Sequence, residues 1–227
     1  MKLYFQDFIY GSIDGAVTTF AVVAGVVGAG LTPNIVLILG FANLFADGFA
    51  MAVASFQASK AQQEFIAMKR ENEEYEIDNF AEEEKQEIRD IYAKKGFKDE
   101  LLDEIVRIIT SRRKVWVDTM MREELGLVED DKKPLDTAFS TFIGFNVIGL
   151  IPLVPFVLLF SLDMGINSDA FWYSTGFTAA AFFLVGMIKG KIVKKSLIKS
   201  GFITLLIGGI AATVAYLVGY SLNLLIS

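Results

Sequence analysis

The chain has 227 residues, of which 53% are hydrophobic and 21% are charged. It contains no cysteine and no histidine, which excludes disulfides, thiolate or imidazole metal sites, and Cys or His nucleophiles. Residues 60–133 hold 15 of the 21 Lys and Arg and 21 of the 27 Asp and Glu, so the net charge of −6 lies entirely in this segment. An acidic segment between apolar flanks fits neither a soluble enzyme nor a nucleic-acid-binding protein, because phosphate backbones attract basic surfaces.

Five apolar runs outside the charged segment are each long enough to cross the hydrocarbon core of a bilayer. They are residues 8–30, 35–57, 137–160, 170–188 and 201–224. No cleavage-site pattern precedes the first run, so we interpret it as a retained helix and not as a signal peptide. The sequence therefore predicts an all-α membrane protein. Residues 1–59 contain spans one and two, residues 60–133 form an acidic helical domain, and residues 134–227 contain spans three to five.

The short loops predict the orientation of the chain, because Lys and Arg are retained on the cytoplasmic side. The loop between the fourth and fifth runs contains Lys189, Lys191, Lys194, Lys195 and Lys199, whereas the loop before the fourth run contains two Asp and no base. Residues 60–133 and the N-terminus are therefore expected in the cytoplasm, with the C-terminus on the opposite side. The membrane would be the cell membrane of a prokaryote or a vacuolar-type membrane of a eukaryote.

Two carboxylates, Asp14 and Asp47, lie within apolar runs. Such groups are costly in a bilayer, by roughly 2.5 to 3.5 kcal/mol on insertion scales, and usually mark a functional site. At about 1.5 Å per residue, Asp14 and Met51 lie at the same depth from the cytoplasmic edge. Asn43, Asp47, Met51 and Ser55 recur every four residues and form a polar stripe on the second span. This pattern predicts a cation path lined by Asp14, Asp47, Met51 and Asn43.

A structural alternative exists for both aspartates. Each precedes a glycine, in Asp14-Gly15 and Asp47-Gly48, and could cap a break in its helix.

Carboxylates in the acidic segment recur three residues apart, as Glu73 with Glu76 and Glu84 with Glu87. Each pair projects from one helix face and can donate two oxygens to a cation. Met120, Met121 and Glu124 follow in a later turn, and thioether sulfur suits Fe(II) and related ions better than Mg(II) or Ca(II). The alternative is that the Glu residues form a solvated helix face. In the same segment, Asp78 or Asn79 is predicted to cap a helix over residues 80–95.

These residues and the segments around them resemble the vacuolar iron transporter family. The resemblance rests on "GSIDGAVTTFAVVAGVVGAG" in span one, "FADGFAMAVASF" in span two, "EEEKQEIRDIYAKKGF" and "MMREELGL" in the acidic segment, and "FNVIGLIPLVPF" in span three. It implies five transmembrane helices, a homodimer with the ion path at its interface, a cytoplasmic metal-binding domain, and export of ferrous iron in exchange for protons. The implied path residues are Asp14 and Met51, and the implied metal ligands are Glu73, Glu76, Glu84, Glu87, Met120, Met121 and Glu124.

Two positions depart from the family pattern. Many plant-type members have Gly-Glu where this chain has Ala54-Ser55, and they have a small residue where this chain has Asp47. Asp47 is therefore a candidate to take over part of the role of the missing carboxylate.

The sequence thus predicts a divalent-metal transporter with Fe(II) as substrate, protons as counter-ion and no organic cofactor. Its expected partners are the metal ion, the lipid bilayer and a second copy of the chain, but not nucleic acid. Mn(II), Co(II) and Zn(II) are possible further substrates, and a manganese or broad divalent-cation exporter is the main alternative. A metal sensor or buffer would not need Asp14 or Asp47, and a di-iron oxidase would need Glu-x-x-His pairs, which a chain without His cannot form.

Overall fold

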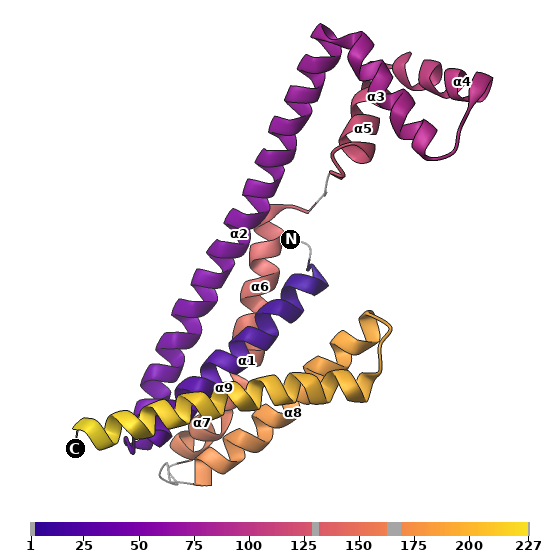
Figure 1. The fold of residues 1–227 in the computed structure, drawn as a ribbon. Coiled ribbons are helices and arrows are strands. Elements are labelled where there is room, and N and C mark those ends of the chain that lie inside the picture. The colour runs from indigo at the N-terminus through magenta and orange to yellow at the C-terminus, as the bar shows by residue number, and fades with distance from the viewer. Residues whose placement is uncertain (1–2, 129–131, 163–168, 227) are drawn as a thin grey trace. The chain divides into compact units, whose positions relative to one another are not determined.

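A computed structural model describes residues 3–128, 132–162 and 169–226 (Figure 1). Every regular element in these ranges is helical. The elements are α1 (Phe5–Gly28), α2 (Pro33–Asn79), α3 (Ala81–Lys94), α4 (Asp99–Thr110), α5 (Arg113–Glu123), α6 (Pro134–Gly149), the 3₁₀ turn η1 (Ile151–Leu153), α7 (Val154–Ser161), α8 (Asp169–Ile192) and α9 (Leu197–Ile226). Five segments of these ranges are long and apolar enough to cross a membrane, which confirms the prediction of an all-α membrane protein with five spans.

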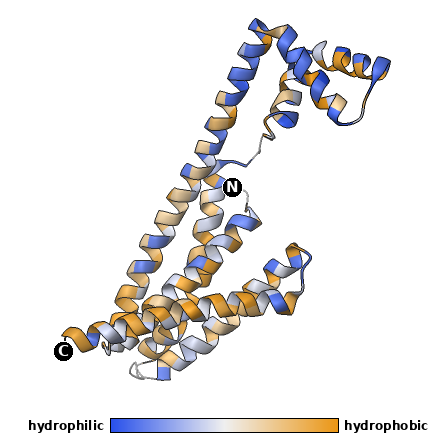
Figure 2. Cartoon of the chain, in the orientation of Figure 1, coloured by the Kyte–Doolittle hydropathy of each residue, from blue (hydrophilic) through white to orange (hydrophobic). Residues whose placement is uncertain are grey.

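The chain divides into two compact units. Residues 1–57 and 133–227 form the first, which we call the membrane unit, and residues 58–132 form the second, which we call the acidic unit. Helix α2 belongs to both, because its first half is apolar and its second half is charged (Figure 2). Each unit has its own apolar core, the first around Phe145 and the second around Ile88.

Helix α1 packs against α6, α8 and α9 in the membrane unit. Glycines allow these close approaches, as small residues commonly do between membrane helices. A Cβ atom on Gly15 would lie 2.8 Å from the Cα of Phe145 on α6, and one on Gly28 would lie 3.1 Å from the Cα of Tyr216 on α9. The backbone N–H of Tyr4 also donates to the Oγ of Ser140, 2.8 Å away, and ties the start of α1 to α6. These contacts fix the position of Asp14, one residue before Gly15.

We expect Gly15→Ala to lower the stability of the membrane unit by about 1 to 3 kcal/mol, the usual range for overpacking, because the new methyl group would meet the α6 backbone. The measurement is the thermal unfolding midpoint of the purified protein in detergent. Gly209→Ala on α9 is the matched control, because no atom lies within 4 Å of the Cβ position there. Equal midpoints for the two variants would contradict the packing argument.

The third apolar run differs from the single helix expected over residues 137–160. Helix α6 ends at Gly149, and the chain then passes through η1 into α7. Pro152 and Pro155 explain the interruption, because proline has no backbone N–H to donate and its ring clashes with the preceding turn. The Oγ of Ser174 on α8 donates to the carbonyl oxygen of Pro152, 2.6 Å away. A side chain of a neighbouring helix therefore satisfies this buried carbonyl group.

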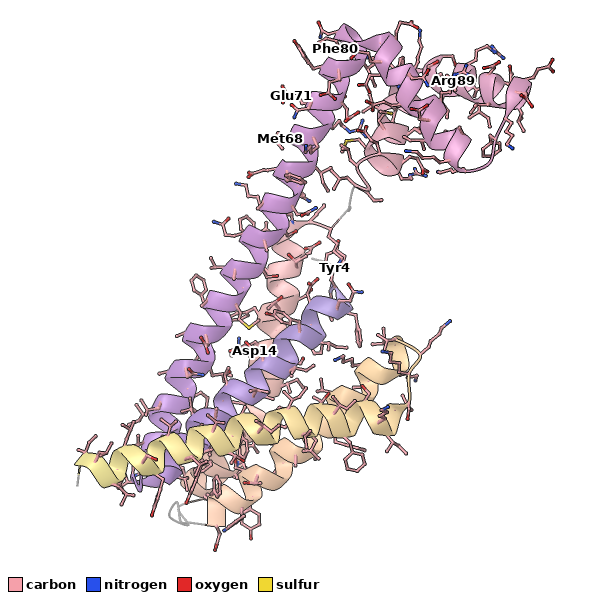
Figure 3. All side chains as sticks on the ribbon, in the orientation of Figure 1. Tyr4, Asp14, Met68, Glu71, Phe80 and Arg89 are labelled. Atoms are coloured by element: carbon pink, nitrogen blue, oxygen red, sulfur yellow. The ribbon has the colours of Figure 1, made fainter. Side chains whose placement is uncertain are left out.

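Ion pairs join the helices of the acidic unit. Arg113 on α5 donates to Glu74 and Asp78 on α2, each at 2.8 Å, and Arg70 on α2 pairs with Asp118 on α5. The predicted cap at Asp78 or Asn79 is therefore wrong. Phe80 occupies the residue before α3 with no side-chain cap (Figure 3), and the Asp78 carboxylate is held by Arg113 instead.

Candidate metal-binding and transport sites

A cluster of carboxylates lies in the acidic unit where α2, α3 and α5 meet. Oxygen atoms of Glu73, Glu76 and Glu84 all lie within 4.8 Å of one another. Glu73 and Glu84 are 3% and 5% exposed, which is unusual for charged side chains, and one oxygen of each is buried without a hydrogen-bond partner among the described residues. The two i, i+3 pairs predicted from sequence thus face each other across two helices.

Glu87 and Glu124 complete the cluster. The charges of Glu87 and Glu124 act on Glu84, and the charges of Glu87 and Glu76 act on Glu124. All five glutamates predicted as ligands are therefore close enough for their charges to interact. We call this group, Glu73, Glu76, Glu84, Glu87 and Glu124, the acidic cluster.

Burial and mutual repulsion change the protonation of the acidic cluster. Desolvation, followed by the charge of Glu124 and then Glu84, raises the pKa of Glu73 from 4.5 to about 7. Desolvation, followed by the charges of Glu87 and Glu76, raises the pKa of Glu84 to about 7, and the pKa of Glu124 is also raised, mainly by desolvation. The charge of Lys69 opposes the shift at Glu124, whereas burial and the neighbouring carboxylates all raise the pKa values of Glu73 and Glu84, so a cation at this position would relieve the repulsion. The donor set, several oxygens of high charge, suits a divalent metal ion.

The two methionines have a different environment. Met120 and Met121 are 0% and 4% exposed and pack in the apolar core with Val117 and Trp116. The backbone N–H of Glu124 donates to the carbonyl oxygen of Met120 at 3.0 Å, so Met120 and Glu124 lie one turn apart at the end of α5. The structure gives both side chains a packing role, and their role as sulfur ligands stays a prediction.

Replacing Met120 and Met121 together by Leu separates these two roles. The change conserves volume and apolar character, so we expect the unfolding free energy to change by less than about 1.5 kcal/mol. If the sulfurs bind metal, affinity for Fe(II) or Co(II) falls while weak Mg(II) binding through the glutamates is unchanged. Isothermal titration calorimetry of the full chain measures both. Equal effects on the two classes of metal, or none, would leave the methionines as core residues only.

In the membrane unit, α1 is a continuous helix through Asp14 (Figure 3), and α2 is a continuous helix through Asp47. The alternative that each aspartate caps a helix break is therefore wrong. Both side chains are half-buried, and the two carboxylates lie close enough for their charges to interact. The helices thus bring two acidic groups together among apolar side chains, where like charges favour a bound cation or proton.

The other predicted path residues lie along α2. Met51, one turn after Asp47, is partly buried and packs against the core around Phe145. Asn43, one turn before Asp47, has a buried Nδ2 with no hydrogen-bond partner among the described residues. That Asp14, Asp47, Met51 and Asn43 together line a cation path stays a prediction.

Sequence reasoning missed Asn146 on α6. Its Nδ2 donates to the carbonyl oxygen of Phe142 at 2.9 Å, and its Oδ1 is buried with no partner in the described part of the chain. A Cβ atom on Gly48 would lie 2.6 Å from the Nδ2 of Asn146. Asn146 therefore lies against α2 at Gly48, the residue that follows Asp47 in the sequence. A lone Asn inside an apolar run was the available signal.

A cavity in the membrane unit is lined by neither Asp14 nor Asp47. It has a volume of about 730 Å³ and lies between α1, α7, α8 and α9, with Phe20, Phe156, Phe171 and Trp172 in its wall. No carboxylate is among the described residues that line it.

Comparison with known proteins identifies the family of this chain. A sequence profile described as the VIT family matches residues 5–220. The chain belongs to the VIT family. The chain is 36% identical to a protein named vacuolar iron transporter from Toxoplasma gondii, over 98% of this chain and 76% of the relative. It is also 36% identical to the vacuolar iron transporter of Plasmodium falciparum, over 96% of this chain and 82% of the relative, and 32% identical to vacuolar iron transporter 1 of Arabidopsis thaliana, over 93% and 83%. These relatives are named as transporters, which agrees with the prediction of a protein that is not an enzyme.

Proposed function

We propose that the protein exports Fe(II) from the cytosol in exchange for protons. The observation that carries the proposal is the acidic cluster, in which five carboxylates converge and Glu73 and Glu84 have pKa values of about 7. Such a group exchanges a metal ion for protons near neutral pH, because metal binding requires the deprotonated carboxylates. Membership of a family whose curated relatives are named iron transporters supports iron as the substrate.

The acidic unit captures the metal on the cytoplasmic side, and the path through the membrane uses Asp14, Asp47, Met51 and Asn43. Asp14 and Asp47 support this step, because their interacting charges can attract a cation and then accept protons when it leaves. The cytoplasmic placement of the acidic unit rests on the five lysines in and beside the α8–α9 loop, which favour the cytoplasmic side. The subunit arrangement proposed here is a homodimer with the path at its interface, as the family resemblance implies.

Transport into proteoliposomes tests the proposal. We expect Fe(II) to accumulate when the lumen is more acidic than the medium, and accumulation to stop when an ionophore dissipates the pH gradient. A metal panel separates the main alternative, since an exporter specific for manganese would accumulate Mn(II) and not Fe(II). Metal binding without flux above that of protein-free liposomes would indicate a sensor or buffer and would overturn the proposal.

A further inference from the structure

The end of α8, the loop after it and the start of α9 present a cluster of positive charge, Lys189, Lys191, Lys194, Lys195 and Lys199, which we call the lysine cluster. All five residues are exposed, and none forms an ion pair with a residue that the structure describes. Residues 170–227 contain no Asp or Glu, and Asp169, the acidic residue of α8, lies in the first turn of that helix, at the end opposite to the cluster. Figure 2 shows this hydrophilic loop at the end of two largely apolar helices.

The backbone holds the lysine cluster in a defined turn. Lys195 N–H donates to the carbonyl oxygen of Gly190 at 2.9 Å and Lys194 N–H donates to that of Lys191 at 3.3 Å, the bond pattern of a Schellman motif. Lys194 takes the left-handed conformation of this motif, with φ of 52°, where glycine is usual. The sequence therefore keeps a charged side chain at a position where glycine would be less strained.

Close helix packing makes the loop a rigid platform. A Cβ atom on Gly186 would lie 2.8 Å from the Cα of Gly201, and one on Gly190 would lie 2.8 Å from the Cβ of Ser200. The α8 and α9 backbones therefore approach each other closely just beneath the loop.

Apolar side chains alternate with the lysines. Ile188, Ile192, Val193 and Ile198 are 46% to 62% exposed. This mixture suits the boundary of a bilayer, where apolar groups enter the acyl region and lysines reach the headgroups. An acidic protein surface would match the lysines but would leave these apolar groups unpaired.

We propose that the lysine cluster binds the headgroups of anionic phospholipids. Clusters of four or more basic residues beside a membrane-spanning helix attract anionic lipid, and the attraction weakens with salt. The proposal does not depend on which ion the protein carries.

Native mass spectrometry of the full chain in neutral detergent, with equal amounts of phosphatidylglycerol and phosphatidylcholine, tests the proposal. We expect wild type to retain phosphatidylglycerol preferentially, and the triple variant Lys191→Gln, Lys194→Gln, Lys195→Gln to bind it roughly 100-fold more weakly, at about fivefold for each lysine. Lys189 and Lys199 are kept so that the orientation signal survives. The triple change to Arg should retain binding, as should a control with Lys94, Lys98 and Lys114 of the acidic unit changed to Gln.

Two further arms keep the test decisive. Lys194→Gly removes one charge and relieves the left-handed strain, so it should bind phosphatidylglycerol less while unfolding at the same or a higher temperature. Glycerol phosphate, which has the charge without acyl chains, should not displace the lipid. The proposal is overturned if the triple Gln variant retains wild-type preference, if glycerol phosphate competes fully, or if wild type does not prefer the anionic lipid. Retention of lipid only after deletion of residues 58–132 would show that the acidic unit is the partner of the lysines, and would also overturn it.

Discussion

Asp14→Ala is expected to abolish metal transport in proteoliposomes while the protein remains folded and inserted. The carboxylate lies on a continuous membrane helix beside Asp47, where it is costly to keep, so its removal should not harm the helix itself. Loss of the charge would remove an attractive position for the cation in a medium of low dielectric constant. The measurement is the initial rate of Fe(II) uptake at saturating metal.

Two controls separate transport from folding. The thermal unfolding midpoint of Asp14→Ala should equal or exceed that of wild type, and calorimetry should show unchanged Fe(II) binding at the acidic cluster. Asp14→Asn, which keeps the shape but not the charge, should behave like Asp14→Ala. Wild-type flux in either variant would remove Asp14 from the path.

The number of spans could be predicted because apolar length is a property of the sequence alone. The ends and breaks of helices depend more on neighbours. Helix α2 continues from Pro33 through the charged segment to Asn79, whereas the third run is broken at Pro152 and Pro155. Both prolines are visible in the sequence, but the donor that satisfies the carbonyl oxygen of Pro152, Ser174 on α8, comes from a distant element.

The acidic cluster could be predicted only in part, because the spacing of its glutamates is visible in the sequence but the packing of its helices is not. The spacing of Glu73 with Glu76 and of Glu84 with Glu87 places each pair on one helix face. The packing of α3 on α2, which buries Glu73 and Glu84 and shifts their pKa values, depends on tertiary contacts around Ile77 and Ile88. Arg113, which holds α5 on α2, lies 35 residues from Asp78 in the chain and gave no local signal.

The two buried side-chain amides of the membrane unit, those of Asn43 and Asn146, also differ in how well the sequence predicts them. Asn43 was found because it shares a period with Asp47 and Met51 on one helix. Asn146 was missed because its importance comes from its contact with Gly48 on another helix. A polar residue within an apolar run can therefore indicate a contact between helices even where it does not recur with other polar residues at helical spacing.

Metal binding at the acidic cluster should strengthen steeply as pH rises toward neutrality. Glu73 and Glu84 have pKa values of about 7, so each must lose a proton to a bound metal below that pH. If both protons are released, affinity should be about 100-fold higher near pH 8 than near pH 6, about tenfold for each carboxylate. Calorimetry of the full chain with Co(II), which is stable in air, measures this dependence and the number of protons released.

The stability of the metal-free protein should depend on pH in the opposite sense. In the unfolded chain both groups have pKa values near 4.5, and folding raises them to about 7, so the folded state binds more protons between these values. The contribution of these groups to the unfolding free energy is therefore largest below about pH 4.5 and falls as pH rises to about 7. Thermal unfolding in the presence of a chelator measures this fall, and added metal should reverse it.

The double variant Glu73→Gln, Glu84→Gln tests whether these two groups cause both effects. Gln keeps the size of each side chain but cannot titrate, so the pH dependence of stability and most of the proton release should disappear, and metal affinity near pH 8 should fall. Glu71→Gln with Glu100→Gln removes the same charge from two exposed positions and should leave the wild-type pH profile unchanged. If the cluster variant keeps the wild-type profile, the titrating groups lie elsewhere and the acidic cluster cannot exchange metal for protons near neutral pH.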